Sequence, residues 1–293
     1  MAELLIGYDI EGSRFEDIMP GITSKFLNMV HKIHIELDAP CTLFIMGKTL
    51  ESHIDAFNKF CNNSIFDIQQ HTYSHISLKN LVENGRNGRC LKGVSLEEIQ
   101  DEVKKTNELL KKHLGVRCIG LTSPNGYYQG LKDRPDILGV LHRLGIRFTR
   151  TYGRNDNGYQ PVPFEIQPFW YEEQGFPDML EIPMQGWQDW LWREEYGWER
   201  TTEYLEHLKS EIDIVKAKNF TWSWVGHDVT CLRSDPEMKI VKGLIEYALS
   251  QNVDIMSCRE FYEKEWRKRQ RSPLPDASGG SGVIMSGKPD IKS

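Results

Sequence analysis

Apolar residues recur along the chain at two different spacings. Short apolar runs rich in β-branched and aromatic residues alternate with longer segments whose apolar positions fall on one helical face, as Ile22, Phe26, Val30 and Ile33 do. This alternation predicts repeated strand–helix units. The expected strands cover 4–8, 41–46, 64–70, 117–121, 147–152, 179–183, 220–225 and 254–257, and the expected helices cover 22–36, 50–60, 96–113, 135–144, 201–217 and 237–250.

Repeated strand–helix units indicate one parallel sheet, either closed as a barrel or open and doubly wound. The strand count of about eight favours the barrel. Ser95 stands three residues before Glu98, which is the spacing of a capping box and predicts a helix start. We therefore expect an α/β barrel domain over 1–266, followed by a flexible tail over 267–293 that begins with basic residues.

The composition is that of an ordinary globular protein. The 293 residues, 39% of them hydrophobic, can bury a full core without disulfides. The six cysteines are scattered without a CxxC pair, which is typical of reduced thiols. Apolar residues 4–6 lack a preceding basic segment and lead to Asp9, so they predict a strand instead of a signal peptide. No apolar run reaches the length of a membrane span. These features predict a cytoplasmic protein and leave room for a homo-oligomer.

The charge of the chain narrows the class of partner. The net charge is −6, so no overall basic field attracts nucleic acid. The one dense basic run, 266–271, is better explained as a solvated helix end. We expect a small-molecule or carbohydrate substrate.

Polar clusters follow three of the predicted strands. Asp9-Ile10-Glu11 follows the first, His71 to His75 the third, and His227-Asp228 the seventh. The carboxyl ends of parallel strands meet at one edge of the sheet, where active sites collect. We therefore expect these clusters to converge.

Two imidazoles four residues apart, His71 and His75, can hold one divalent metal if the backbone turns helically after the strand. With nine histidines in the chain, the spacing alone is a weak signal, and the two could be unrelated polar residues. The histidine pair directly follows one predicted strand, and Asp9 and Glu11 follow another predicted strand. This placement favours metal binding. One of these two acids can complete a site of two histidines and one carboxylate, and the other can accept a proton from a water that the metal activates. Alternatively, both acids are surface or helix-capping residues before Gly12.

His227 supplies the remaining function that hydrolysis of a carbon–nitrogen bond needs. The leaving nitrogen must be protonated, and a histidine at a strand end suits that task. Asp189 could orient or charge this imidazole.

These residues, in this order, resemble the polysaccharide deacetylase family, also called carbohydrate esterase family 4 or the nodulation-type deacetylase domain. The resemblance runs from Glu3 to about Phe261 and implies a distorted (β/α)7-8 barrel. The matching motifs are the spaced acid pair in Gly7-Tyr8-Asp9-Ile10-Glu11, the segment His71-Thr72-Tyr73-Ser74-His75, the strand 41–47, the segment Thr122-Ser123-Pro124-Asn125-Gly126, Asp189-Trp190 or Trp187, and Val225-Gly226-His227-Asp228.

The resemblance implies a role for each matching residue. Asp9 would be the general base and His227 the general acid, assisted by Asp189. Glu11, His71 and His75 would hold a divalent metal, most often zinc, although the roles of Asp9 and Glu11 could be exchanged. The backbone N–H of Asn125 would stabilise the oxyanion, and the implied substrate-binding residues are Asn125, Gly126, Tyr127, Trp187 and Trp190.

The chain departs from the family pattern in three respects. Thr122 stands where the family has an arginine that steadies the base, Glu11 replaces an aspartate, and no export signal is present. These departures resemble a divergent intracellular branch that includes allantoinase-like and cyclic-imide-hydrolase-like proteins and deformylases of lipid-linked sugars. Six of the eight tryptophans lie between Trp187 and Trp224, where they could stack on sugars or pack the core.

Three functions follow from these observations. The first is metal-dependent N-deacetylation or deformylation of an amino sugar or a polysaccharide-related substrate. The second is ring opening of cyclic imides or ureides by the same chemistry. The third is a non-catalytic carbohydrate-binding barrel, and the missing arginine is its only support in the sequence.

Overall fold

The computed structural model of the chain describes residues 1–84 and 88–271, which form an α/β barrel. Its parallel strands follow the order β10-β1-β2-β3-β6-β7-β9, and β8 joins β9 antiparallel. The start of β1 also pairs with β11, and β4 and β5 form a separate hairpin. The strands are β1 Glu3–Ile10, β2 Cys41–Ile45, β3 Phe66–Gln70, β4 Leu81–Glu83, β5 Arg89–Leu91, β6 Gly120–Tyr128, β7 Phe148–Arg154, β8 Phe169–Tyr171, β9 Phe176–Glu181, β10 Thr221–His227 and β11 Asp254–Met256.

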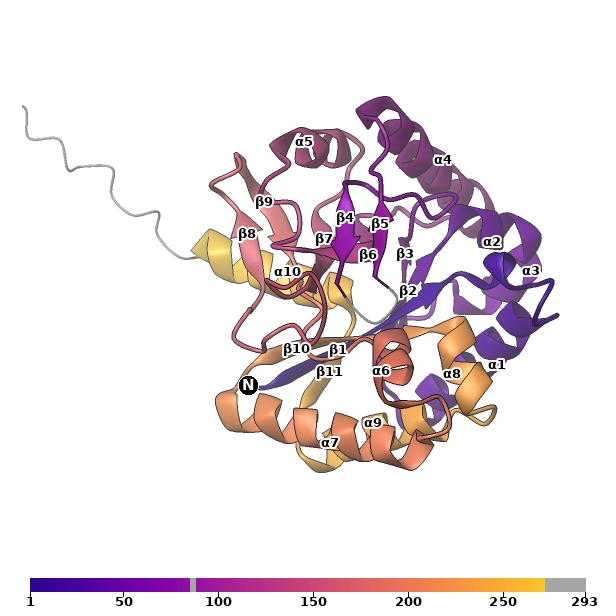
Figure 1. Cartoon of the computed structure of the whole chain (residues 1–293). Helices are drawn as coiled ribbons and strands as arrows, with labels where there is room; N and C mark the ends of the chain where they lie inside the picture. Colours follow the sequence, from indigo (N-terminus) through magenta and orange to yellow (C-terminus); the bar gives the residue numbers. More distant parts are fainter. Residues whose placement is uncertain (85–87, 272–293) are drawn as a thin grey trace, which may run out of the picture.

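The helices are arranged around the outside of the strands (Figure 1). The β4–β5 hairpin and α6 lie at the end of the barrel that faces the viewer. The helices are α1 Ile22–Leu37, α2 Gly47–Ser52, α3 Ile54–Phe57, α4 Leu96–Leu114, α5 Pro135–Arg143, α6 Asp189–Tyr196, α7 Thr201–Lys218, α8 Asp228–Ser234, α9 Lys239–Ser250 and α10 Cys258–Arg271, with 3-10 turns at Gly12–Arg14 and Asn58–Phe60.

The barrel is distorted at the seam between β9 and β10. Within residues 1–84 and 88–271, no backbone ladder joins these two strands. Side chains bridge the gap instead: Gln185 Nε2 donates to the Thr221 carbonyl at 3.2 Å, and Gln185 Oε1 accepts from the Ser223 N–H at 3.0 Å. The indole of Trp222 donates to the Gln185 carbonyl at 3.0 Å. The distorted barrel expected from the sequence is therefore confirmed.

Alternation along β1 separates the core from the barrel interior, because successive side chains of a strand point to opposite faces. Leu4, Ile6 and Tyr8 belong to the large core between strands and helices. Leu5 belongs to a smaller cluster, and Gly7 and Asp9 share its face of the strand. The other members of the smaller cluster, which fills the barrel and packs against α10, are Phe44, Phe148, Leu180, Ile182, Cys258, Phe261 and Tyr262.

The predicted elements are found within a few residues of their expected positions, with four differences. The helix expected over 50–60 is interrupted at His53, which caps both α2 and α3. The strand expected over 117–121 begins and ends later, because β6 continues through an irregularity between Thr122 and Tyr127. The pattern predicts no strand where β4 and β5 form their hairpin or where β8 pairs with β9. The pattern also missed α6, α8 and α10, of which the first two are short.

The end of the chain differs in part from the expected tail. Helix α10 runs to Arg271, so residues 267–271 are helical. The rest of the tail predicted over 267–293 lies outside the described residues.

All six cysteines are free thiols, as expected. Ser95 is the N-cap of α4, since its Oγ accepts from the Glu98 N–H at 3.2 Å. Among the described helices, none combines the length and the apolar character that crossing a bilayer requires.

Candidate active site

The polar clusters of three strands meet at one end of the barrel, as the strand order predicts. Asp9 is paired in register with His227, because β1 and β10 are parallel neighbours. Glu11 directly follows β1, and His71 directly follows β3. The sheet therefore brings Asp9, Glu11, His71 and His227 to a common edge.

His75 reaches this edge through a tight turn that is not helical, in contrast to the expected helical turn. Thr72 and His75 adopt positive φ angles of 59° and 65°. The His75 N–H donates to Thr72 Oγ1 at 3.1 Å. Glu102 of α4 accepts from both the backbone N–H and the hydroxyl of Ser74, each at 2.7 Å. The turn is therefore fixed from the neighbouring helix, and it aligns the two imidazoles.

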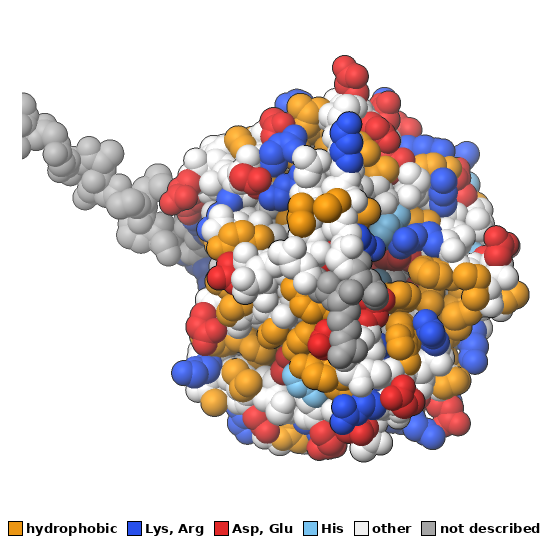
Figure 2. Space-filling view, viewed as in Figure 1, with side chains coloured by type: hydrophobic (Ala, Val, Ile, Leu, Met, Phe, Trp, Pro, Cys, Tyr) orange, Lys and Arg blue, Asp and Glu red, His pale blue; other side chains and the backbone are white. Residues whose placement is uncertain are grey.

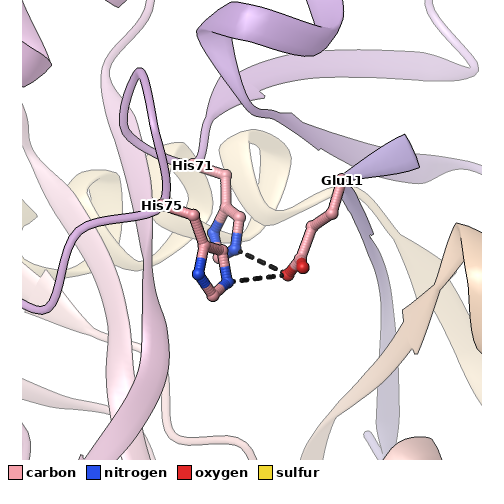
Figure 3. A group of neighbouring side chains, drawn as sticks. All are labelled: Glu11, His71 and His75. Carbon is pink, nitrogen blue, oxygen red and sulfur yellow. Dashed lines mark hydrogen bonds and ion pairs between the residues drawn. The ribbon is translucent and has the colours of Figure 1, made fainter. Parts of the chain in front are cut away.

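Glu11, His71 and His75 form a compact group of metal-ligand type (Figure 3). Glu11 Oε1 lies 3.0 Å from His71 Nε2 and 3.0 Å from His75 Nε2. His71 Nδ1 donates to the Thr122 carbonyl at 2.9 Å, and this hydrogen bond orients the ring so that its Nε2 faces Glu11. Two imidazole nitrogens and one carboxylate oxygen within 4.8 Å of one another fit a divalent transition ion.

The electrostatics of Glu11 agree with this grouping. Burial by itself raises the pKa of the carboxyl group, but the adjacent imidazoles of His75 and His71 outweigh it and hold the pKa well below its usual range. Glu11 is therefore ionised, as a metal ligand must be.

Asp9 lies on the other side of Glu11 and is buried. Its Oδ1 accepts no hydrogen bond within the described part of the chain and lies 3.6 Å from Nη1 of Arg150. Its Oδ2 lies 4.0 Å from His227 Nε2. Asp9, Glu11 and His227 form a second group whose ligand atoms lie within 4.8 Å of one another. Glu11, not Asp9, contacts both histidines of the turn.

His227 is held by Asp189, the first residue of α6. His227 Nδ1 donates to Asp189 Oδ1 at 2.5 Å, and its backbone N–H donates to Oδ2 at 2.8 Å. Burial alone lowers the pKa of His227, but the Asp189 carboxylate outweighs burial and raises the pKa to about 10. The imidazole is therefore protonated at neutral pH, with Nε2 directed toward the two acids.

These groups line a cavity of about 230 Å³. Figure 2 shows histidine, acidic and basic side chains close together near the middle of this face. The remaining lining residues come mainly from the 3-10 turn after β1, from β6 and from α6. Besides the two groups above, they are Arg14, Phe15, Glu83, Arg89, Ser123, Asn125, Gly126, Arg154, Met184, Gln188, Trp190, Leu191 and Glu194.

The expected substrate-binding residues divide into two sets. Asn125, Gly126 and Trp190 line the cavity. Tyr127 and Trp187 do not belong to this lining. The Tyr127 hydroxyl accepts from the Leu78 N–H at 2.7 Å, and Trp187 packs edge-to-face against aromatic neighbours. Trp222 and Trp224 are likewise buried in the core, so much of the tryptophan cluster packs the barrel.

Several charged residues at the site were missed by the sequence patterns. Arg14 contacts Glu11 and lies 3.1 Å from His75 Nε2. Arg150 and Arg154 are both buried and come from β7. The signal that could have found them is the presence of two arginines on an apolar strand, because a buried charge requires a partner.

Comparison with known protein families gives a match over part of the chain. Residues 13–149 match the polysaccharide deacetylase family. The match includes His71 and His75, whereas Asp9 precedes it and His227 follows it. The comparison with curated proteins gave no match.

Solved structures share the fold at low sequence identity. A structure from Mycobacterium smegmatis, assigned to the polysaccharide deacetylases, is 14% identical with a TM-score of 0.66 and covers 99% of this chain and 94% of its own. Puue allantoinase is 15% identical with a TM-score of 0.67, and the match covers 91% of this chain and 90% of the allantoinase chain. A pseudoenzyme of carbohydrate esterase family 4 from Bacillus anthracis is 10% identical with a TM-score of 0.52, and the match covers 89% of this chain and 65% of the pseudoenzyme chain. The sequence match covers 13–149, and over its described residues the chain shares its barrel fold with solved structures assigned to the polysaccharide deacetylases.

Proposed function

We propose that the protein is a metal-dependent hydrolase of non-peptide carbon–nitrogen bonds that removes an acetyl or formyl group from an amino sugar or a related small amide. The observation that carries the proposal is the position of Glu11 Oε1, 3.0 Å from the Nε2 atoms of both His71 and His75. Asp9 and His227 border the same cavity, which provides a proton acceptor and a proton donor beside the ligand group.

Glu11, His71 and His75 would hold the metal, with zinc as the expected ion because it favours nitrogen and oxygen ligands in this number. When bound, a divalent ion supplies Lewis-acid polarisation of the acyl carbonyl and lowers the pKa of water. The hydrogen bond from His71 Nδ1 to the Thr122 carbonyl keeps Nε2 available as a ligand.

Asp9 is the proposed general base. Its Oδ2 faces His227 across 4.0 Å and takes the proton of the attacking water. Glu11 is less suited to this task, because both of its histidine contacts commit its Oε1 to the ligand group.

His227 is the proposed general acid. It holds a proton on Nε2 and delivers it to the leaving nitrogen. Asp189 fixes the orientation of the imidazole through Nδ1 and favours its protonated form. The pair therefore keeps an acid ready at neutral pH.

Binding of the acyl group is assigned to β6 and α6. The backbone N–H of Asn125 is the proposed donor to the oxyanion, and Trp190 offers an aromatic face to the substrate. A cavity of about 230 Å³ is smaller than the roughly 300–1,000 Å³ common for drug-sized ligands. This size favours a short acyl group on a single ring.

The test is a deacylation screen of the purified, zinc-loaded protein. We expect release of acetate or formate from N-acylated hexosamines. Ring opening of a cyclic imide or ureide, with no release of acetate or formate from N-acylated hexosamines, would support the second hypothesis. A protein that holds no stoichiometric metal and hydrolyses neither class would contradict the proposal and favour a binding barrel.

Replacement of Asp189 by asparagine should change the pH dependence of the reaction. A general acid is active while protonated, so activity falls as pH rises through its pKa. Removal of the adjacent carboxylate lowers the pKa of His227, and the basic limb of the kcat/KM profile should move to lower pH by about one unit or more. Activity is then lost mainly at alkaline pH.

The matched control is Asp178→Asn. Asp178 likewise pairs with a histidine, His142, at 3.0 Å, but neither residue lines the cavity. Its replacement should leave the profile unchanged. An unshifted basic limb in Asp189→Asn would count against His227 as the acid.

A further inference from the structure

A buried guanidinium lies beside Asp9, although the sequence around Thr122 lacks an arginine. Arg150 of β7 is fully buried, and its Nη1 lies 3.6 Å from Asp9 Oδ1. We propose that Arg150 is the positioning residue that fixes the Asp9 carboxylate for proton transfer. This inference rests on the proposed function, because it requires Asp9 to be the proton acceptor.

The guanidinium is anchored by the neighbouring strands. Its Nε donates to Ser223 Oγ at 3.0 Å and its Nη2 donates to the Trp224 carbonyl at 3.2 Å, both on β10. Its Nη1 donates to Thr122 Oγ1 at 3.2 Å on β6. The Cζ atom lies 4.7 Å from the ring centre of Phe44 on β2. Because these contacts hold it on several sides, the guanidinium is a fixed reference for Asp9.

The strand register explains how the arginine reaches this place. Thr122 of β6 and Arg150 of β7 are direct partners across the parallel pair. An arginine at position 150 therefore enters the barrel at the same level as position 122, one strand further along. The hydroxyl of Thr122 is short enough to leave the space free and polar enough to accept from the guanidinium.

Gly7 provides the space on the opposite side. It lies two residues before Asp9 and shares its face of β1. A Cβ atom at this position would lie 2.3 Å from Nη1 and 2.7 Å from Cζ of Arg150. The guanidinium therefore occupies the volume of a side chain that Gly7 lacks, next to the carboxylate.

The charge distribution assigns the two oxygens of Asp9 different tasks. Oδ1 is buried without a hydrogen bond and faces Arg150, whereas Oδ2 lies on the side of His227. At 3.6 Å the guanidinium compensates the charge without forming a hydrogen bond to the carboxylate. Oδ2 remains available for the proton.

The decisive experiment compares two glycine-to-alanine variants of the zinc-loaded protein. Gly7→Ala should displace the guanidinium and lower kcat by roughly 10²-fold, since a shift of about 1 Å at a reacting group has that effect. KM and zinc content should stay within about threefold of wild type, because the ligand residues are untouched.

Gly120→Ala is the matched control, because a Cβ there would lie 2.1 Å from the ring of Phe148 and not near Arg150. It introduces a comparable clash into another strand of the same sheet, β6, and kcat per folded molecule should stay near the wild-type value. A crystal structure of metal-free Gly7→Ala should show the Asp9 carboxylate turned from its present place. This readout does not depend on activity.

Two substitutions of the arginine complete the test. Arg150→Met should lose kcat to the same extent as Gly7→Ala, and Arg150→Lys should recover part of it because the charge returns. Equal kcat values in wild type, Gly7→Ala and Arg150→Met would overturn the proposal. If Arg150→Met fails to fold, the two alanine variants decide alone. An inactive wild type would instead refute the proposed function, so the two failures are distinguishable.

Discussion

His75→Ala is expected to lose bound zinc and to lower kcat/KM by at least about 10³-fold. The substitution removes one of three ligand atoms that lie within 4.8 Å of one another and leaves two, which is too few for a closed zinc site. Elemental analysis of the purified variant measures the metal, and the deacylation assay measures the rate. The effect should be large because both the Lewis acid and the activated water disappear together.

The control for this variant is His113→Ala, in the last turn of α4 and far along the chain from the site. It removes an imidazole without touching the ligand group, so metal content and rate should be those of wild type. Full zinc content in His75→Ala would refute the assignment of Glu11, His71 and His75 as the metal ligands.

Asp9→Asn is expected to lower kcat by about 10²–10⁴-fold while zinc stays bound, since a positioned general base contributes about that factor. The amide has nearly the shape of the carboxylate but cannot accept the proton. KM should change little, because Asp9 is not assigned to substrate binding. The measurement is steady-state kinetics combined with elemental analysis.

Asp67→Asn is a suitable control, because Asp67 is a buried carboxylate of β3 that is paired with Arg259 at 3.1 Å. Its loss should lower the melting temperature without a comparable loss of kcat per folded molecule. Loss of zinc in Asp9→Asn would show that Asp9 is a ligand and that the roles of Asp9 and Glu11 are exchanged.

The fold and the convergence of the site could be predicted because they depend on local periodicity and strand order. Short apolar runs in the sequence located β1, β3 and β10, and parallel strands necessarily bring their carboxyl ends together. His71, His75, Asp9 and His227 therefore met at one edge as expected.

Other features depend on contacts between residues far apart in sequence. Arg150 reaches Asp9 only because β7 is the neighbour of β6 and because Gly7 has no side chain. Tyr127 directly follows a matching motif, yet the irregularity in β6 places its hydroxyl against the backbone of Leu78. A pattern of residue types along one segment contains no information on either arrangement.

The open seam between β9 and β10 has a consequence for how such a protein can evolve. Gln185 and its neighbours close the barrel through side chains, and the segment that contains them continues into α6, which lines the cavity. Insertions or substitutions in this segment can change the circumference of the barrel without breaking hydrogen bonds between strand backbones. The ends of β1 and β3, which precede Glu11 and His71, lie elsewhere on the ring. His227 at the end of β10 and Asp189 at the start of α6 lie beside the seam, so changes there are compatible with the proposed chemistry only where they preserve this pair.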